Sequence, residues 1–218
     1  MAARLKKAHL WKKETGRVEL NRIERLITGS PMRAWSQEHM QAPLLRKMAR
    51  RQSYPRCFEI GCGRGIGARI IVESFGAEKV VATDADPSEV ERARRQLKPG
   101  HEGRVEFKVA DAMQLDEPDE AYDAVFSFGV LHHMEDWRKA VREVMRILKP
   151  GGELFFEEIL RPLLASFLMR KLTRHPEGGR FTVQELREEL GADGAEVTGL
   201  RTVDGWLAFG VAQKRGAP

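Results

Sequence analysis

The stretch that decides the fold lies at residues 59–67 and reads Glu-Ile-Gly-Cys-Gly-Arg-Gly-Ile-Gly. It follows a short apolar run, Cys57–Ile60, which predicts a buried strand, and it opens a helical pattern at Ile66–Phe75. Glycines at 61, 63 and 65 let the backbone turn tightly and come close to a ligand. A glycine-rich turn between strand and helix is typical of an open α/β sheet that binds a ligand at its strand ends.

Strand and helix patterns alternate after this turn. Strands are expected at Cys57–Ile60, Val80–Thr83, Val105–Val109, Tyr122–Phe128 and Glu153–Ile159, and helices at Ile66–Phe75, Pro87–Leu97 and Glu135–Leu148. Asp86 is the expected N-cap of the helix that begins at Pro87, and Lys149-Pro150-Gly151-Gly152 is the expected end of the last one. Because such alternation requires parallel strands joined by crossovers, the fold class is α/β with a doubly wound, mostly parallel sheet.

The pattern changes after Ile159. An apolar helix is expected at Leu163–Leu172, and a second helix at Thr182–Leu190 begins with the capping box of Thr182 and Glu185. Two strands, Ala195–Arg201 and Trp206–Ala212, are joined by a turn at Asp204-Gly205 and predict an antiparallel hairpin at the sheet edge.

The chain divides by composition into two parts. Residues 1–54 are polar and helix-like and are expected to form an N-terminal helical segment or lid, and residues 55–218 are expected to form the ligand-binding domain. Basic residues crowd the beginning of the first part: Arg4, Lys6, Lys7, Lys12, Lys13 and Arg17. We interpret them as a solvated arm and leave open a weak contact with an anionic membrane surface or RNA.

Composition excludes several classes of protein. The 218 residues are 42% hydrophobic, enough for a core, with a formal charge of +5 and only two cysteines. Two cysteines make no disulfide framework and fit a reducing cytosol, so a cytoplasmic location is expected. No apolar run is long enough for a membrane span, and we expect no secretory signal because no apolar run follows the basic N-terminus. No residue spacing indicates a metal site.

Three carboxylates accompany the glycine-rich turn. Glu59 lies inside the strand before it and suits a ligand that carries an ammonium group better than one that carries a pyrophosphate. Asp84 ends the second strand, where a carboxylate can accept hydrogen bonds from both hydroxyls of a ribose. Asp111 follows the third strand and could meet an adenine amino group. A dinucleotide site stays open as an alternative because Gly63-x-Gly65-x-x-Ala68 satisfies the looser form of that motif.

With these residues in place, the chain resembles the class I S-adenosylmethionine-dependent methyltransferases between about Arg56 and Ile159. The matching segments are Glu-Ile-Gly-Cys-Gly-Arg-Gly at 59–65, Val-Ala-Thr-Asp at 81–84, Val-Ala-Asp-Ala at 109–112, residues 122–133 and Arg-Ile-Leu-Lys-Pro-Gly-Gly at 146–152. The sequence pattern of these segments is most similar to the small-molecule branch of the family, which includes the ubiquinone and menaquinone biosynthesis methyltransferases.

The resemblance implies a seven-stranded sheet with an antiparallel last strand and S-adenosyl-L-methionine as cofactor. It assigns cofactor binding to Glu59, Gly61, Cys62, Gly63, Gly65, Asp84, Ala85, Asp111, Ala112 and Phe128.

For the acceptor of the methyl group, the sequence predicts candidate residues and a general chemical class. His132 and His133 are the candidate catalytic bases, since the loop after the fourth strand should face the methyl group, and His133 is preferred. Either Glu157 or Glu158 should face the same crevice. The segments Ile27–Trp35 and Pro162–Leu172 are candidate lids, and their apolar residues favour a small hydrophobic acceptor.

Two other classes of function are weighed. An NAD(P)-dependent oxidoreductase is disfavoured because the strict glycine spacing fails at Ile66 and no catalytic Tyr and Lys pair is present. A non-catalytic cofactor-binding or RNA/protein interaction module stays open. Nucleic acid is disfavoured as acceptor because basic and aromatic residues are not interleaved. The oligomeric state is left at monomer or homodimer.

Overall fold

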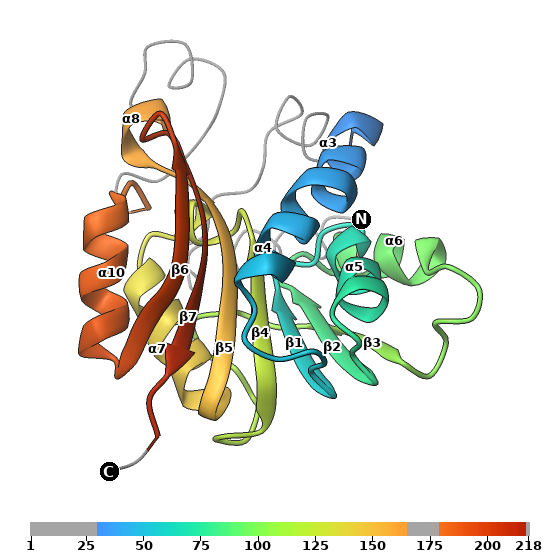
Figure 1. The fold of residues 1–218 in the computed structure, drawn as a ribbon. Coiled ribbons are helices and arrows are strands. Elements are labelled where there is room, and N and C mark those ends of the chain that lie inside the picture. Colours follow the sequence, from blue (N-terminus) through green and yellow to red (C-terminus); the bar gives the residue numbers. More distant parts are fainter. Residues whose placement is uncertain (1–29, 165–178, 217–218) are drawn as a thin grey trace, which may run out of the picture.

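Seven strands form one mixed sheet with helices on both faces (Figure 1). The computed structural model describes residues 30–164 and 179–216. The strands are β1 (Arg56–Ile60), β2 (Lys79–Asp84), β3 (Val105–Val109), β4 (Tyr122–Phe128), β5 (Leu148–Ile159), β6 (Ala195–Val203) and β7 (Leu207–Lys214). The helices are α3 (Pro31–Ser36), the π-helix η1 (Gln37–Gln41), α4 (Ala42–Met48), α5 (Ile66–Ser74), α6 (Pro87–Gln96), the 3-10 helix η2 (Leu131–His133), α7 (Trp137–Ile147), α8 (Arg161–Leu164) and α10 (Val183–Ala192).

The strand order is β3-β2-β1-β4-β5-β7-β6. Strands β1 to β5 run parallel to one another, whereas β7 is antiparallel to both β5 and β6. The order reverses between β2-β1 and β1-β4, so the carboxyl ends of β1 and β4 open the crevice where such sheets bind ligands. The predicted fold class and the antiparallel last strand are confirmed.

The two faces of the sheet bury separate apolar clusters. Helices α7 and α10 cover one face, where Trp137 and Leu186 pack with Phe156. Helices α4, α5 and α6 cover the other face, where Leu45 and Phe75 pack with strand aromatics (Figure 1). Side chains alternate between the two clusters along each strand because successive residues point to opposite faces.

The predicted turn between the helix Glu135–Leu148 and the strand Glu153–Ile159 needs a correction. We expected Lys149-Pro150-Gly151-Gly152 to be a turn, but β5 already begins at Leu148. Tyr122 pairs with Leu148 and Ala124 with Glu153, so the extra residues of β5 form an irregularity beside β4. A proline is tolerated there because a bulged segment leaves its ladder position unused.

The N-terminal helix runs from Pro31 to Met48 and contains a π-helical turn, η1. Pro43 lies just after that turn and has no N–H to donate, which explains why the regular hydrogen-bond pattern is interrupted here. The second half of this helix, α4, packs on β7, with Leu45 fully buried. In the first half of the helix, Trp35, the last residue of the candidate lid segment Ile27–Trp35, is 55% exposed and stacks on His39.

Several predictions fall on residues that the structure does not describe. They are the basic cluster between Arg4 and Arg17, the first part of the lid segment Ile27–Trp35, and the helix Leu163–Leu172 beyond Leu164. Within residues 30–164 and 179–216, no helix has the length and apolar character needed to cross a membrane.

Candidate active site at the carboxyl edge of the sheet

The loop between β1 and α5 is built on left-handed glycines. Gly61, Gly63 and Gly65 have φ angles of 65°, 50° and 82°, a region that side chains with a Cβ adopt only under strain. The loop is tied to β2, since Cys62 N–H donates to the Thr83 carbonyl at 2.8 Å. Apart from its chain neighbours, no atom of the described residues lies within 4 Å of where a Cβ of Gly63 would stand, so this part of the structure leaves the outer side of the loop open to a ligand.

Glu59 is the buried carboxylate beneath this loop. Its side chain accepts a hydrogen bond from Ala68 N–H in the first turn of α5, while its Oε2 has no partner among the described residues. Burial first, and the charge of Asp84 second, raise the pKa of Glu59 to about 8. A buried acceptor without a donor is costly, so this site is suited to a cationic ligand group that would complete it.

Gly67 makes room for that carboxylate. A Cβ at this position would lie 1.8 Å from Glu59 Oε1 and 2.7 Å from a ring carbon of Phe128. The structure therefore brings Phe128, predicted as a cofactor residue at the end of β4, next to Glu59. Gly67 was not singled out as a site residue, although it belongs to the quoted glycine-rich stretch.

Asp84 ends β2 and holds the glycine loop. Its carboxylate accepts hydrogen bonds from Gly63 N–H at 3.0 Å and from Asp86 N–H at 2.9 Å. These two hydrogen bonds hold the carboxylate at the end of β2 beside the glycine loop. Ala85 beside it is buried.

Asp111 and Ala112 lie at the neighbouring strand end. Asp111 Oδ1 accepts from Met113 N–H at 2.9 Å, the local turn bond that short acidic side chains often make. Ala110 N–H donates to the Asp84 carbonyl at 3.1 Å, which keeps this loop beside the end of β2. The predicted cofactor residues thus gather along one edge of the sheet.

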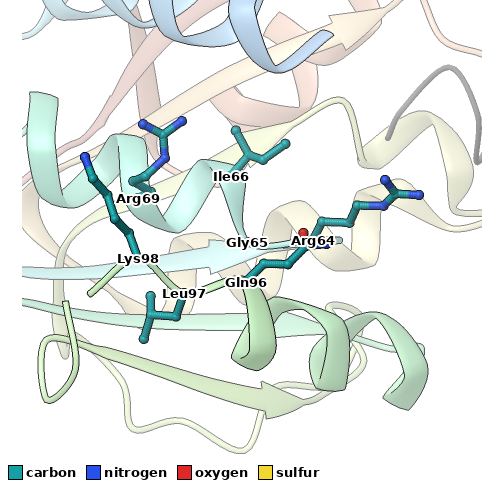
Figure 2. A pocket seen from close by; sticks show the side chains of 7 residues that line it. All are labelled: Arg64, Gly65, Ile66, Arg69, Gln96, Leu97 and Lys98. Atoms are coloured by element: carbon teal, nitrogen blue, oxygen red, sulfur yellow. The ribbon is translucent and has the colours of Figure 1, made fainter. Parts of the chain in front are cut away.

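A separate hollow lies on the other side of the glycine loop, between the start of α5 and the end of α6 (Figure 2). Its cavity volume is about 60 Å³, and its lining includes Arg69 and Lys98. Arg69 pairs with Glu38 and Glu73, and Lys98 pairs with Glu73. Because these positive charges are matched within the protein, the hollow shows no comparable demand for a ligand.

The loop after β4 is held by Glu158. This fully buried carboxylate accepts from the backbone N–H groups of Val130, Leu131 and His132 and from Ser127 Oγ. It also lies 2.7 Å from His132 Nδ1. Burial raises the pKa of Glu158 to about 7, against the opposing effect of these hydrogen bonds.

The two histidines of this loop have different surroundings. His132 is 1% exposed and engaged with Glu158, whereas His133 is half-buried. Their rings lie 4.2 Å apart between centroids. Of the two candidate bases, His133 is the more accessible to a substrate, and His132 contributes to the architecture of the loop.

Glu157 faces the N-terminal helix. Its Oε1 lies 2.5 Å from Nη1 of Arg33, which reaches the end of β5 from α3. Sequence reasoning missed Arg33, because nothing local distinguishes this arginine from the others in the basic N-terminal region. Its position depends on a contact between residues 124 positions apart.

Other candidate chemistry is absent from the described part of the chain. Cys57 and Cys62 are buried free thiols, and burial raises the pKa of both. Neither is therefore poised as a thiolate nucleophile. Within residues 30–164 and 179–216, no group of His, Cys, Asp and Glu side chains is placed to hold a metal ion.

Comparison with known proteins agrees with the class that this fold and loop define. Residues 58–156 match the family model described as a methyltransferase domain. This part of the chain is similar to the methyltransferase domains of the S-adenosylmethionine-dependent class.

Two curated relatives align with the same region. The 27-O-demethylrifamycin SV methyltransferase of Amycolatopsis mediterranei (strain S699) is 40% identical over 108 residues, which cover 48% of this chain and 39% of the relative. The 2-methyl-6-phytyl-1,4-hydroquinone methyltransferase of Synechocystis is 35% identical over 96 residues, covering 44% and 29%. The chain thus spans well under half the length of these relatives.

Solved structures agree on the fold. A putative methyltransferase of Haloferax volcanii, in complex with the Trm112 methyltransferase activator, superposes with a TM-score of 0.70 at 18% identity. The alignment covers 85% of this chain and 93% of that one.

Proposed function

We propose that this protein transfers a methyl group from S-adenosyl-L-methionine to a small, apolar molecule. The observation that carries the proposal is the buried Glu59 Oε2, which has no partner among the described residues and lies beneath an open glycine loop. An ammonium group is the chemical complement of such a carboxylate, and the amino-acid part of this cofactor carries one. A pyrophosphate in the same place would be repelled.

In this proposal the carboxyl edge holds the cofactor along its length. Glu59 binds the ammonium group, and the amides of the loop at Gly61, Gly63 and Gly65 approach the middle of the molecule. Asp84 accepts from the ribose hydroxyls while keeping its bonds to the loop. Asp111 and Ala112 border the adenine.

Cys62, Ala85 and Phe128 complete the lining of the proposed site. All three are buried, with exposures of 5%, 3% and 8%. Their apolar contacts would exclude water from the bound cofactor.

The bound cofactor supplies a methyl group that is already strongly electrophilic. The protein then has to hold donor and acceptor in line and exclude water, which can contribute much of the rate. His133 takes the acceptor proton where the acceptor requires it. His132 and Glu158 act by fixing the loop that carries His133.

The acceptor side is formed by the N-terminal part of the chain. We propose residues 1–54 as a segment that covers the methyl acceptor over the domain 55–218; the described part of this segment, residues 30–54, contains α3, η1 and α4. The two curated relatives are named as methyltransferases of a demethylrifamycin and of a hydroquinone, and these names support a small apolar methyl acceptor. The free buried cysteines support a cytoplasmic location.

Transfer of a tritium-labelled methyl group to a panel of small apolar hydroxy compounds tests the proposal. Label incorporated into at least one compound, and lost in the Glu59→Gln protein, is the expected result. Cofactor binding without transfer to any small molecule would instead assign the chain to non-catalytic binding proteins.

A further inference from the structure

Glu157 presents a second buried carboxylate at the carboxyl edge of the sheet. The residue is 3% exposed, and its Oε2 makes no hydrogen bond with any described group. Its other oxygen, Oε1, is paired with Arg33, and the side chain of Gln37 lies beside the carboxylate. The carboxylate therefore has one oxygen paired with Arg33 and one that lacks a donor among the described residues.

The position of Glu157 points to the acceptor rather than to the cofactor. Glu157 pairs in register with Phe128, the last residue of β4, and Gly129 N–H donates to the Glu157 carbonyl at 2.7 Å. A Cβ at Gly129 would lie 3.3 Å from Arg33 Nη2 and 3.7 Å from His132 Cε1. The N-terminal helix, the loop after β4 and the end of β5 therefore converge at Gly129.

We propose that Glu157 Oε2 accepts a hydrogen bond from a hydroxyl or N–H group of the methyl acceptor. This inference rests on the proposed function, since it assigns the group that orients the acceptor in the methyltransferase site. Glu157 is in this account a specificity-determining residue, and Arg33 keeps its charge matched.

The charge pattern selects among acceptors. Burial raises the pKa of Glu157, Arg33 lowers it, and the neighbouring Glu158 raises it. A carboxylate on the methyl acceptor would be repelled by Glu157, and Arg33 is already engaged with Glu157 at 2.5 Å. A neutral donor satisfies Oε2 without adding charge. A site built to bind a hydroxyl rejects the analogue that lacks it, because its own buried group is then left unpaired.

Three probes of similar size test the inference: phenol, anisole and benzoate. Each is titrated into the protein saturated with S-adenosylhomocysteine, and binding is followed by NMR at the Gly129 amide and the Arg33 side chain. Phenol is expected to bind at least tenfold more tightly than anisole and benzoate, because only phenol donates a neutral hydrogen bond.

The Glu157→Gln protein is expected to lose the preference for phenol, since the variant replaces the carboxylate that accepts the hydrogen bond by an amide. Glu91→Gln is the matched control, because it removes the acid of an exposed Arg–Glu pair, with Arg95, on the surface of α6. It should leave the preference unchanged. Thermal unfolding of both variants shows whether each is folded.

The outcomes separate the inference from the proposed function. Equal binding of phenol and anisole, tighter binding of benzoate, or no binding of phenol would overturn the inference, whatever the variants do. These results would leave the proposed function standing if S-adenosylhomocysteine binds. Failure of S-adenosylhomocysteine to bind would overturn the proposed function, and the three probes would then be compared on the cofactor-free protein.

Discussion

Glu59 and Glu157 lie on the same face of the sheet, on the two strands that flank β4. Glu59 pairs in register with Phe126 and Glu157 with Phe128, so the two carboxylates are two strands and two residues apart. Strand geometry places their Cα atoms roughly 12 Å from each other. Each has an Oε2 with no partner among the described residues. At this separation they serve two different ligand groups, one at each end of a shared crevice.

Replacing Glu59 by Gln is expected to weaken cofactor binding by about tenfold to a hundredfold. The reason is the loss of a charge-assisted hydrogen bond to the ammonium group, worth about 1.5–3 kcal/mol. Calorimetry with S-adenosylhomocysteine measures the effect. Glu106→Gln, at an exposed acid on β3, is the control and should bind normally. Unchanged affinity in the Glu59→Gln protein would show that the carboxylate does not contact the cofactor.

The same variant has a predicted effect on stability. The pKa of Glu59 is about 8 in the folded protein against 4.5 for the free side chain. Between these values the folded state binds more protons than the unfolded state, so stability falls as pH rises through that range. Glu59→Gln should reduce this decline. Urea unfolding of both proteins at pH 5 and pH 8 measures it, and parallel pH profiles would contradict the account.

Cofactor affinity is expected to depend on pH through the same group. Below about 8 the Glu59 carboxyl is largely protonated, and an ammonium ligand favours its ionised form. Affinity should therefore rise with pH up to about 8, above which the ligand's α-ammonium group loses its own proton, and binding at pH 7 should release about one proton. Calorimetry in two buffers with different ionisation heats counts the proton. Proton uptake on binding would have the wrong sign.

Gly67→Ala is expected to disable the cofactor site. The added Cβ would lie 1.8 Å from Glu59 Oε1, so either the carboxylate or the start of α5 must move. Such overpacking costs about 1–3 kcal/mol of stability. Gly191→Ala in α10 is the control, since no atom of residues 30–164 and 179–216 outside its own helix and neighbours stands within 4 Å of its Cβ position. It should stabilise the protein by about 0.5–1 kcal/mol. Equal melting temperatures for the two variants would refute the prediction.

Glu158→Gln is expected to loosen the loop that carries the histidines. The amide would present a donor to at least one backbone N–H that now donates to the carboxylate, costing about 1–3 kcal/mol locally. Hydrogen exchange at residues 130–132 should accelerate, while S-adenosylhomocysteine still binds. Ser127→Ala, which removes one hydrogen bond to the same carboxylate, should have a smaller effect. Unchanged exchange at these amides would contradict the assigned role.

Much of the fold was predictable because its signals are local. Asp86 caps α6 through Ser88 N–H, and Thr182 with Glu185 forms the predicted capping box of α10. Asp204 and Gly205 take positive φ angles of 49° and 69° at the hairpin turn, as expected for these residue types. The start of β5 was predicted too late, since the register shift beside β4 is a property of two strands together.

The candidate site was predictable only in part. The glycine loop, Glu59, Asp84 and Asp111 share a sequence pattern, because each follows or ends a strand of recognisable character. Arg33 could not be found this way, since its role depends on the path of the N-terminal helix across the sheet. The same holds for the division of labour between Glu157 and Glu158, which point to opposite faces of β5 and engage Arg33 and His132 respectively.

The central claim concerns the ligand of the glycine loop, and calorimetry of the purified protein tests it most directly. Titration with S-adenosylmethionine, S-adenosylhomocysteine and NADH should give micromolar binding of the first two and none of the third. The Asp84→Ala protein should bind the first two much more weakly. Preferential binding of NADH, or full affinity for S-adenosylmethionine without the Asp84 carboxylate, would contradict the account.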